Sequence, residues 1–270
     1  METIIEPARP APDLRELWRY RELLYVLVLR DIRARYRQMA LGPAWIALKP
    51  LITMVIFSLV FGGLAGLPSD GVAYPVFTFT ALLPWMAFAE AARASAGSLV
   101  ARMDVIAKVY FPRLVVPLAA VLAALLDLVV SFGVLLVLMA ISGEGVLSWR
   151  WLLLPGYVLL AAATALAIGL WAAAAAVRFR DLRFAVGYLM QAGIYATPVA
   201  YAASIVPEPW LSALKLNPMF WVVEGFRWAL LGTGTPPEPA MLIPLLAVGL
   251  ALASGVVVFH RMERTIVDWL

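Results

Sequence analysis

The sequence contains few residues whose types and spacing match a catalytic or metal-binding site. Its three lysines, Lys49, Lys108 and Lys215, are not preceded by the glycine pattern of a phosphate-binding loop, so the chain is not expected to hydrolyse ATP by that route. Cysteine is absent, and the single histidine, His260, follows a long apolar run. An interfacial histidine is therefore favoured over a metal ligand. No catalytic residue, cofactor or metal is predicted in this chain.

Two features place charge within apolar stretches. Asp127 is the only acid deep within a predicted membrane span, and an intramembrane acid is a functional candidate by default. A lone acid without acidic or basic partners makes a poor proton relay, so a structural role is favoured, with Ser131 one turn later as its partner. Glu90 and Arg93 lie three residues apart, which predicts an ion pair on one face of a helix.

A short charged stretch, ARMDVIAKVYFPR at residues 101–113, lies between two long apolar runs. It carries Arg102, Lys108 and Arg113 against Asp104 alone. Its apolar residues recur at spacings of three and four, which predicts a short amphipathic helix that a proline near its end stops. A helix held between two membrane spans would let a partner outside the membrane move both spans together. The alternative is a positive loop that only fixes membrane topology.

Residues 14–39 predict an N-terminal amphipathic helix at the membrane interface, called the interfacial helix below. Trp, Tyr and Leu side chains recur at helical spacing, while Arg30, Arg33 and Arg37 form a stripe on another face. Basic residues opposite aromatic and aliphatic ones suit the headgroup region of an anionic leaflet. A solvated basic helix without membrane contact is the alternative, and it is disfavoured because a span follows directly. The Pro-rich residues 1–13 are expected to be a flexible tail.

The composition indicates a polytopic membrane protein. Hydrophobic residues make up 64% of the chain and charged residues 14%, whereas about a quarter of a soluble domain is charged. Apolar runs of more than roughly 18 residues predict helices that cross a bilayer. The expected fold is a single all-α domain with six transmembrane helices at about 44–67, 72–97, 114–141, 151–177, 184–204 and 240–259.

The positions of Lys and Arg set the predicted orientation. The N-terminal region, residues 101–113, the charged turn at 178–183 and the C-terminal tail collect basic residues on one side. Arg150, Lys215 and Arg227 fall on the other side. Six spans with both termini in the cytoplasm satisfy this distribution. The net charge of +4 therefore needs no nucleic-acid partner to explain it.

Residues 205–239 contain too much proline and charge to span a membrane and are too aromatic for a free loop. Two short helices, at about 209–216 and 218–231, fit this stretch best. They either dip into the membrane as a re-entrant element, covered by protein, or lie flat on the outer surface. The sequence leaves both arrangements open.

One face of the predicted fifth span carries aromatic and amide side chains at positions i, i+4, i+7 and i+11, namely Phe184, Tyr188, Gln191 and Tyr195. Aromatic rings stack on the apolar C–H faces of sugars, while hydroxyl and amide groups hydrogen-bond their polar rims. Phe57 and Phe61 lie four apart on the first span. A translocation path is favoured over packing or lipid contact, because a glutamine that faces lipid near mid-membrane is costly.

Several short motifs, taken in order, resemble the transmembrane subunit of ABC-2-type polysaccharide exporters, which export lipid-linked O-antigen, teichoic acid or capsule. Each motif is weak alone, but their order and spacing are specific, and the resemblance covers almost the whole chain from Leu14. The motifs are LVLRDIRARYRQMALGPAW at 27–45, LLPW at 82–85, KVYFPR at 108–113, VRFRD at 177–181, TPVAY at 197–201 and LNP at 216–218.

The resemblance implies a permease that works as a homodimer with two copies of a separate ATPase, which binds ATP and magnesium. Residues 101–113 would be a coupling helix seated in a cleft of that ATPase, with contacts from Arg102, Asp104, Lys108, Tyr110, Phe111 and Arg113. An undecaprenyl-type lipid-linked polysaccharide would enter at the interfacial helix. Residues 205–239 would form re-entrant helices on the periplasmic side of a bacterial inner membrane, and the path would run between the first and fifth spans of the two subunits.

Two other functions remain open from the sequence. An exporter of a small hydrophobic drug or lipid in the same superfamily would share this architecture. An integral-membrane lipid-headgroup enzyme is disfavoured, because its acids and histidines would cluster at one membrane face, and here the acids are scattered. The motifs do not distinguish O-antigen, capsule and teichoic acid.

Overall fold

A computed structural model describes residues 14–36, 41–102, 111–145, 147–176, 179 and 181–266. Within these ranges the chain is helical and has no strand, which confirms the predicted all-α class. The helices are α1 (Leu14–Arg19), α2 (Arg21–Tyr36), α3 (Trp45–Phe57, continued by π-helical turns at Ser58–Leu64), α4 (Tyr74–Gly97), α6 (Val115–Ser142), α7 (Leu154–Ala176), α8 (Leu182–Gly193), α9 (Trp210–Lys215), α10 (Pro218–Leu230) and α11 (Leu242–Ile266).

Five helical stretches within the described ranges are long and apolar enough to cross a membrane. They correspond to the predicted first, second, third, fourth and sixth spans, and they indicate a multi-pass membrane protein. Their bounds are Gly42–Leu64, Tyr74–Gly97, Val115–Ser142, Trp149–Ala176 and Pro239–Met262.

The predicted fifth span, residues 184–204, is not a single helix. α8 has 12 residues and ends at Gly193, and turns follow. Twelve helical residues extend about 18 Å, against roughly 30 Å for the hydrocarbon core. Pro198 has no N–H to continue the helical ladder. Gly193 also lies so close to α4 that an added Cβ would be 2.9 Å from the Trp85 ring. The expectation of six full-length helical spans is therefore not confirmed.

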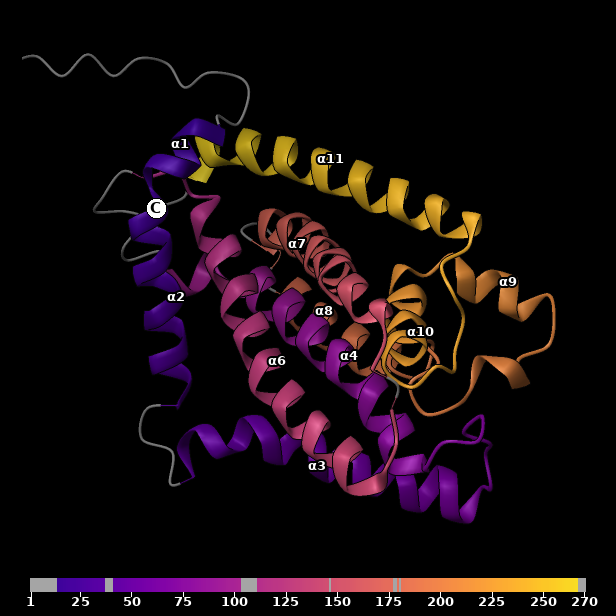
Figure 1. The fold of residues 1–270 in the computed structure, drawn as a ribbon. Coiled ribbons are helices and arrows are strands. Elements are labelled where there is room, and N and C mark those ends of the chain that lie inside the picture. Colours follow the sequence, from indigo (N-terminus) through magenta and orange to yellow (C-terminus); the bar gives the residue numbers. More distant parts are fainter. Residues whose placement is uncertain are drawn as a thin grey trace, which may run out of the picture.

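α4 is the central helix, and most of its side chains are buried. It packs most extensively against α6 and α7, and also contacts α3, α8 and α10 (Figure 1). Gly169 of α7 faces Ser95 of α4 so closely that an added Cβ would lie 2.1 Å from the serine Oγ. Small residues at this crossing let the two backbones approach, as is usual between membrane helices. α11 packs on α7 and forms the top of the molecule in Figure 1.

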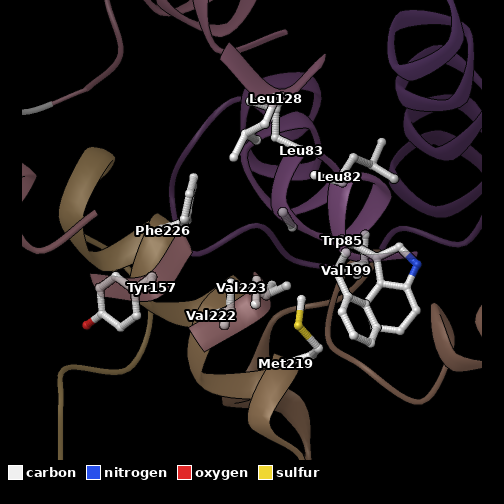
Figure 2. Close-up of a cluster of buried hydrophobic side chains, with 14 of the residues drawn as sticks. Leu82, Leu83, Trp85, Leu128, Tyr157, Val199, Met219, Val222, Val223 and Phe226 are labelled. Carbon is white, nitrogen blue, oxygen red and sulfur yellow. The ribbon is translucent and has the colours of Figure 1, made fainter. Parts of the chain in front are cut away.

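The main hydrophobic core joins α10 to α4, α6 and α7. Figure 2 shows part of it, where apolar side chains of α10 face those of the long helices. The labelled side chains are Leu82, Leu83 and Trp85 of α4, Leu128 of α6, Tyr157 of α7, Val199 of the segment after α8, and Met219, Val222, Val223 and Phe226 of α10.

The two short helices predicted within residues 205–239 are present as α9 and α10. Asn217 caps α10, because its side-chain oxygen accepts a hydrogen bond from the backbone N–H of Met219 at 2.9 Å. α10 is buried against α4 and α7, whereas α9 has no buried residue. α10 is therefore part of the protein core, and its re-entrant position stays a prediction.

A buried ion pair fixes the chain that follows α8. Arg227 and Glu224 of α10 are both buried, and their charged atoms lie 2.9 Å apart. Arg227 also donates to the carbonyl oxygens of Pro198 at 2.5 Å and Val199 at 2.8 Å, and its guanidinium lies 3.6 Å from the centre of the Phe77 ring. These contacts satisfy the buried charge, whose isolation would be strongly destabilising. They also hold the irregular backbone around residues 198–201 against α10.

Candidate functional site

The segment predicted as the interfacial helix forms α1 and α2 over its described residues, with a break at Tyr20, and α2 docks on α6. Leu27 and Val28 of α2 form a cluster with Val115, Ala119 and Ala123 of α6. Figure 1 shows α2 along the left edge of the molecule, beside α6 and at a steep angle to α3.

The predicted arginine stripe faces away from this contact. Arg30 and Arg33 are exposed, and Arg37 lies outside the described residues. Their role at an anionic membrane surface stays a prediction. The outward position of the first two leaves their charges available to phosphate groups.

An ion pair that the sequence did not predict joins α2 to α6. Arg35 of α2 contacts the carboxylate of Asp127, and the Tyr36 hydroxyl donates to the same carboxylate at 2.9 Å. The predicted partner of Asp127 was wrong, since the Ser131 hydroxyl donates instead to the carbonyl oxygen of Ile46 at 3.2 Å. Asp127 lies within a span but has a basic partner supplied by another helix.

The charge states of the α2 residues follow from these contacts. Burial opposes the charge of Arg35, but the carboxylates of Asp127 and Glu90 outweigh it, so the pKa of Arg35 is raised. Burial, followed by the hydrogen bond to Asp127, raises the pKa of Tyr36 to about 12. At physiological pH Arg35 is therefore charged, and Tyr36 keeps the proton that it donates.

Glu90 of α4 connects this ion pair to a further arginine. Arg93 lies 3.4 Å from Glu90, which confirms the predicted pair on one helix face. Arg35 approaches Glu90 from α2 at 3.9 Å. Two carboxylates and two guanidinium groups from α2, α4 and α6 thus form one partly exposed network.

A cavity of about 260 Å³ opens beside this network, and we call it the charged cavity. Its charged lining consists of Arg35, Lys49 and Arg93 against Glu90 and Asp127, and the remaining walls are mostly apolar side chains of α3, α4 and α6. Lys49 is exposed and has no ion-pair partner in the described part of the chain. A cavity with apolar walls and one uncompensated cation suits an amphiphile with an anionic headgroup.

Both ends of the 101–113 segment are anchored to the membrane domain. Arg102 is buried and pairs with Asp31 of α2. Phe111 is buried in a cluster with Val116 of α6, Leu170 of α7 and Phe259 of α11. The residues between them, including the predicted contact residues Asp104, Lys108 and Tyr110, lie outside the described residues.

Arg113 follows at the end of the 101–113 segment and is partly buried. Because Arg102 pairs with Asp31 of α2, a force on the segment would reach α2. Because Phe111 packs in a cluster with side chains of α6, α7 and α11, the same force would reach those three helices. The role of the segment as a docking site stays a prediction.

The predicted path residues divide into two groups. The side chains of Phe184, Tyr188 and Gln191 on α8 are exposed, and so is Tyr195 in the turn that follows the helix, so these side chains are not covered by the rest of the described chain. Phe57 is buried and forms an edge-on ring contact with Phe61, with centroids 5.2 Å apart. Phe57 belongs to the hydrophobic core of the subunit, and Phe61 is partly buried and packs against that core. Within one subunit, Phe57 and Phe61 therefore do not lie beside the exposed side chains of α8.

Sequence reasoning missed Arg35, Asp31 and the pair of Glu224 and Arg227. The last pair had a visible signal, because an acid and a base three residues apart in a strongly apolar stretch tend to pair. Arg35 had no such signal. It lies among several other arginines of the same helix, and only the docking of α2 on α6 selects it.

Comparison with known proteins gives several relatives. The O-antigen export system permease protein RfbA of Myxococcus xanthus is 33% identical over 256 residues, which cover 93% of this chain and 96% of the relative. The O-antigen export system permease protein RfbA of Klebsiella pneumoniae is 29% identical over 210 residues, which cover 76% of this chain and 79% of the relative. The polysialic acid transport protein KpsM of Escherichia coli is 26% identical over 218 residues, which cover 76% of this chain and 80% of the relative. Residues 22–231 match the family described as ABC-2 type transporter, a range that includes the charged cavity and α8.

Proposed function

Because the chain belongs to the ABC-2 type transporter family, we propose that it is the membrane subunit of an ATP-driven exporter of a lipid-linked polysaccharide such as O-antigen. The names of the relatives support this class of substrate. The polysaccharide is carried on an undecaprenyl-type lipid and crosses the bacterial inner membrane. Both termini of the subunit lie in the cytoplasm.

The observation that carries the proposal is the charged cavity beside the interfacial helix. A lipid-linked glycan presents an apolar chain, a phosphate group and a sugar polymer. Apolar walls accept the first part, and the uncompensated charge of Lys49, with Arg35 and Arg93 beside it, attracts the second. The cavity lies next to α2, whose exposed arginines attract the same phosphate chemistry at the membrane surface.

Two copies of this chain work with two copies of a separate ATPase, which holds ATP and magnesium. This arrangement supplies the energy source, since the sequence has no phosphate-binding loop of its own. The 101–113 segment is the ATPase contact. Its anchors at Arg102 and Phe111 connect that contact to the interfacial helix and to three long helices.

Inverted membrane vesicles that contain this chain and its partner ATPase test the proposal. Labelled lipid-linked glycan is expected to move into the vesicle lumen only when ATP is present and only when both proteins are present. Transport of a hydrophobic drug without transport of the glycan would favour the drug-exporter alternative. Transport without the ATPase, or ATP hydrolysis by this chain alone, would reject the proposal.

A further inference from the structure

A second pocket, of about 560 Å³, lies where the chain after α8 meets α9 and the start of α10. We call it the aromatic pocket. Three of its walls are the rings of Tyr195, Tyr201 and Trp210, and the Asn217 amide lies among them. Small and aliphatic side chains complete the lining. This pocket shares no residue with the charged cavity.

The wall that carries the tyrosines is held in place although its backbone is irregular. The Tyr201 hydroxyl donates to the carbonyl oxygen of Tyr195 at 3.3 Å. Arg227 donates to the carbonyl oxygen of Tyr201 at 3.4 Å, in addition to its bonds to the carbonyl oxygens of Pro198 and Val199. The Asn217 amide donates to the Thr197 hydroxyl at 2.9 Å. A pocket whose walls are fixed by such supporting bonds is preorganised for a ligand.

The wall that α9 forms is fixed as well. The indole N–H of Trp221 on α10 donates to the carbonyl oxygen of Lys215, the last residue of α9, at 2.8 Å. The Lys215 ammonium pairs with Glu238 at 2.9 Å. α9 is thereby tied to α10 and to the residue before the last span, and Trp210 at its first position lines the pocket together with the two tyrosines.

The lining chemistry selects a neutral polar ligand with apolar faces. None of the eight lining residues, all within the described ranges, carries a charge, and the nearby Lys215 is already paired. An anionic phosphate would thus lose its hydration without gaining a cation. Within the described chain, the indole N–H of Trp210 and the hydroxyl of Tyr195 have no protein partner, so both are free to donate to a ligand. Aromatic rings with a few polar groups match the C–H faces and hydroxyl rims of neutral sugars.

The structure assigns to the aromatic pocket the binding of a neutral segment of the exported glycan, separate from the site that accepts the lipid phosphate. This assignment rests on the proposed function and adds a second contact with the polymer. Tyr195 links the exposed side chains of α8 to the pocket, because it lies exposed in the turn directly after α8 and also lines the pocket. A polymer that follows α8 would thus meet Tyr201 and Trp210 next.

The test uses the vesicle assay with substitutions at Trp210 and a matched control. Trp149 is 66% exposed and Trp210 is 69% exposed, and Trp149 lies outside the pocket, against Trp228. Trp210→Ala is expected to lower the glycan export rate by roughly 2- to 10-fold, the range of a single aromatic stacking contact. Trp210→Phe is expected to keep most of the rate, and Trp149→Ala to leave it unchanged. Trp210→p-benzoylphenylalanine is expected to cross-link to labelled glycan when ATP is present.

Each other outcome overturns the inference in a distinguishable way. Normal export by Trp210→Ala, with no glycan cross-link at position 210, rejects the pocket while the proposed function stands. An equal loss in Trp210→Ala and Trp149→Ala, with cross-links to lipid, makes Trp210 an interfacial membrane anchor. Cross-links between two copies of the chain make the pocket a subunit contact. Absence of glycan export by the unaltered protein rejects both the proposed function and the pocket.

Discussion

Arg102 and Asp31 form an ion pair that ties the start of the 101–113 segment to the middle of α2. The two residues are 71 positions apart in the chain. The Arg102 side chain is almost fully buried and that of Asp31 is largely buried, so water screens the pair weakly. This pair is a direct mechanical connection between the predicted ATPase contact and the helix where the substrate is proposed to enter.

Asp31→Asn is expected to uncouple ATP hydrolysis from export. Loss of the carboxylate leaves the buried Arg102 charge without its partner and costs about 1–3 kcal/mol of stability. Export should then fall more than the ATPase rate, because α2 no longer follows the 101–113 segment. The measurement is the number of glycans exported per ATP hydrolysed in vesicles, together with the thermal unfolding temperature of the complex.

A charge-swapped pair and an exposed arginine serve as controls for this prediction. Asp31→Arg combined with Arg102→Asp should restore part of the lost coupling, since neighbouring sites are not additive. Arg21→Gln removes an exposed arginine of the same helix that contacts only Trp18 within the described residues. Equal ratios of export to hydrolysis in Asp31→Asn and Arg21→Gln would show that the ion pair transmits nothing.

The contact of Arg35 and Tyr36 with Asp127 is expected to control how firmly α2 docks on α6. Arg35→Ala leaves the Asp127 carboxylate with one hydrogen bond and should increase amide hydrogen exchange along α2. Tyr36→Phe removes one hydrogen bond and should have a smaller effect, of about 0.5–1.5 kcal/mol. Arg33→Ala, on the exposed face, should leave the exchange unchanged. Similar exchange in the Arg35 and Arg33 variants would contradict the docking role.

Lys49 is expected to contribute to recognition of the lipid-linked substrate in the charged cavity. Lys49→Gln removes the cation that no carboxylate of the described chain neutralises, at a cost of about 1 kcal/mol per charge, or roughly a 5-fold rise in the apparent KM for substrate. Lys49→Arg should retain most of the affinity because the charge is kept. An unchanged KM in Lys49→Gln would remove this cavity from the substrate path.

Local patterns in the sequence predicted most helices, because each depends on residues close in the chain. The apolar runs gave five stretches that the structure shows as long helices. The two short helices of 205–239 were predicted from a stretch too rich in proline and charge to span and too aromatic for a free loop, and α9 and α10 lie close to the predicted bounds. The pair of Glu90 and Arg93 followed from their spacing of three on one helix.

Features that depend on distant residues could not be predicted in the same way. Asp127 was assigned to Ser131, one turn away, whereas its partners lie 91 and 92 positions earlier in the chain. Gly193, where α8 ends, lies against Trp85 of α4, a contact that no local pattern reveals. Phe57 and Phe61 have the spacing of an exposed stripe, but the fold covers Phe57.

The exposed arginines of the interfacial helix are expected to bind anionic lipid. Replacement of Arg30, Arg33 and Arg37 together should weaken this binding by about 1 kcal/mol per charge. The binding of the purified complex to vesicles with and without anionic lipid measures the effect. Raised salt should reduce the difference between the variant and the unaltered protein, because salt screens exposed charges. Unchanged vesicle binding and unchanged export would contradict the interfacial role.

The exposed face of α8 is expected to line the translocation path, and the absence of cysteine from the chain makes this testable by chemical labelling. Tyr188 is 71% exposed and Tyr195 is 62% exposed, whereas Val186 and Met190 of the same segment are 6% and 8% exposed. Single cysteines at 188, 191 and 195 should react with a water-soluble thiol reagent, and cysteines at 186 and 190 should not. Position 193 is unsuitable as a buried control, because a side chain there would collide with Trp85.

The substrate dependence of this labelling distinguishes a path from a surface that merely faces water or lipid. A glycan that occupies the path should protect cysteines at 188, 191 and 195 during ATP-driven export. A lipid-facing surface would resist the water-soluble reagent with or without substrate, and would react with a membrane-soluble maleimide instead. A contact between two copies of the chain would give disulfides across the dimer at these positions under oxidation, without protection by substrate. Protection by glycan that depends on ATP is therefore the result that only a translocation path along α8 produces.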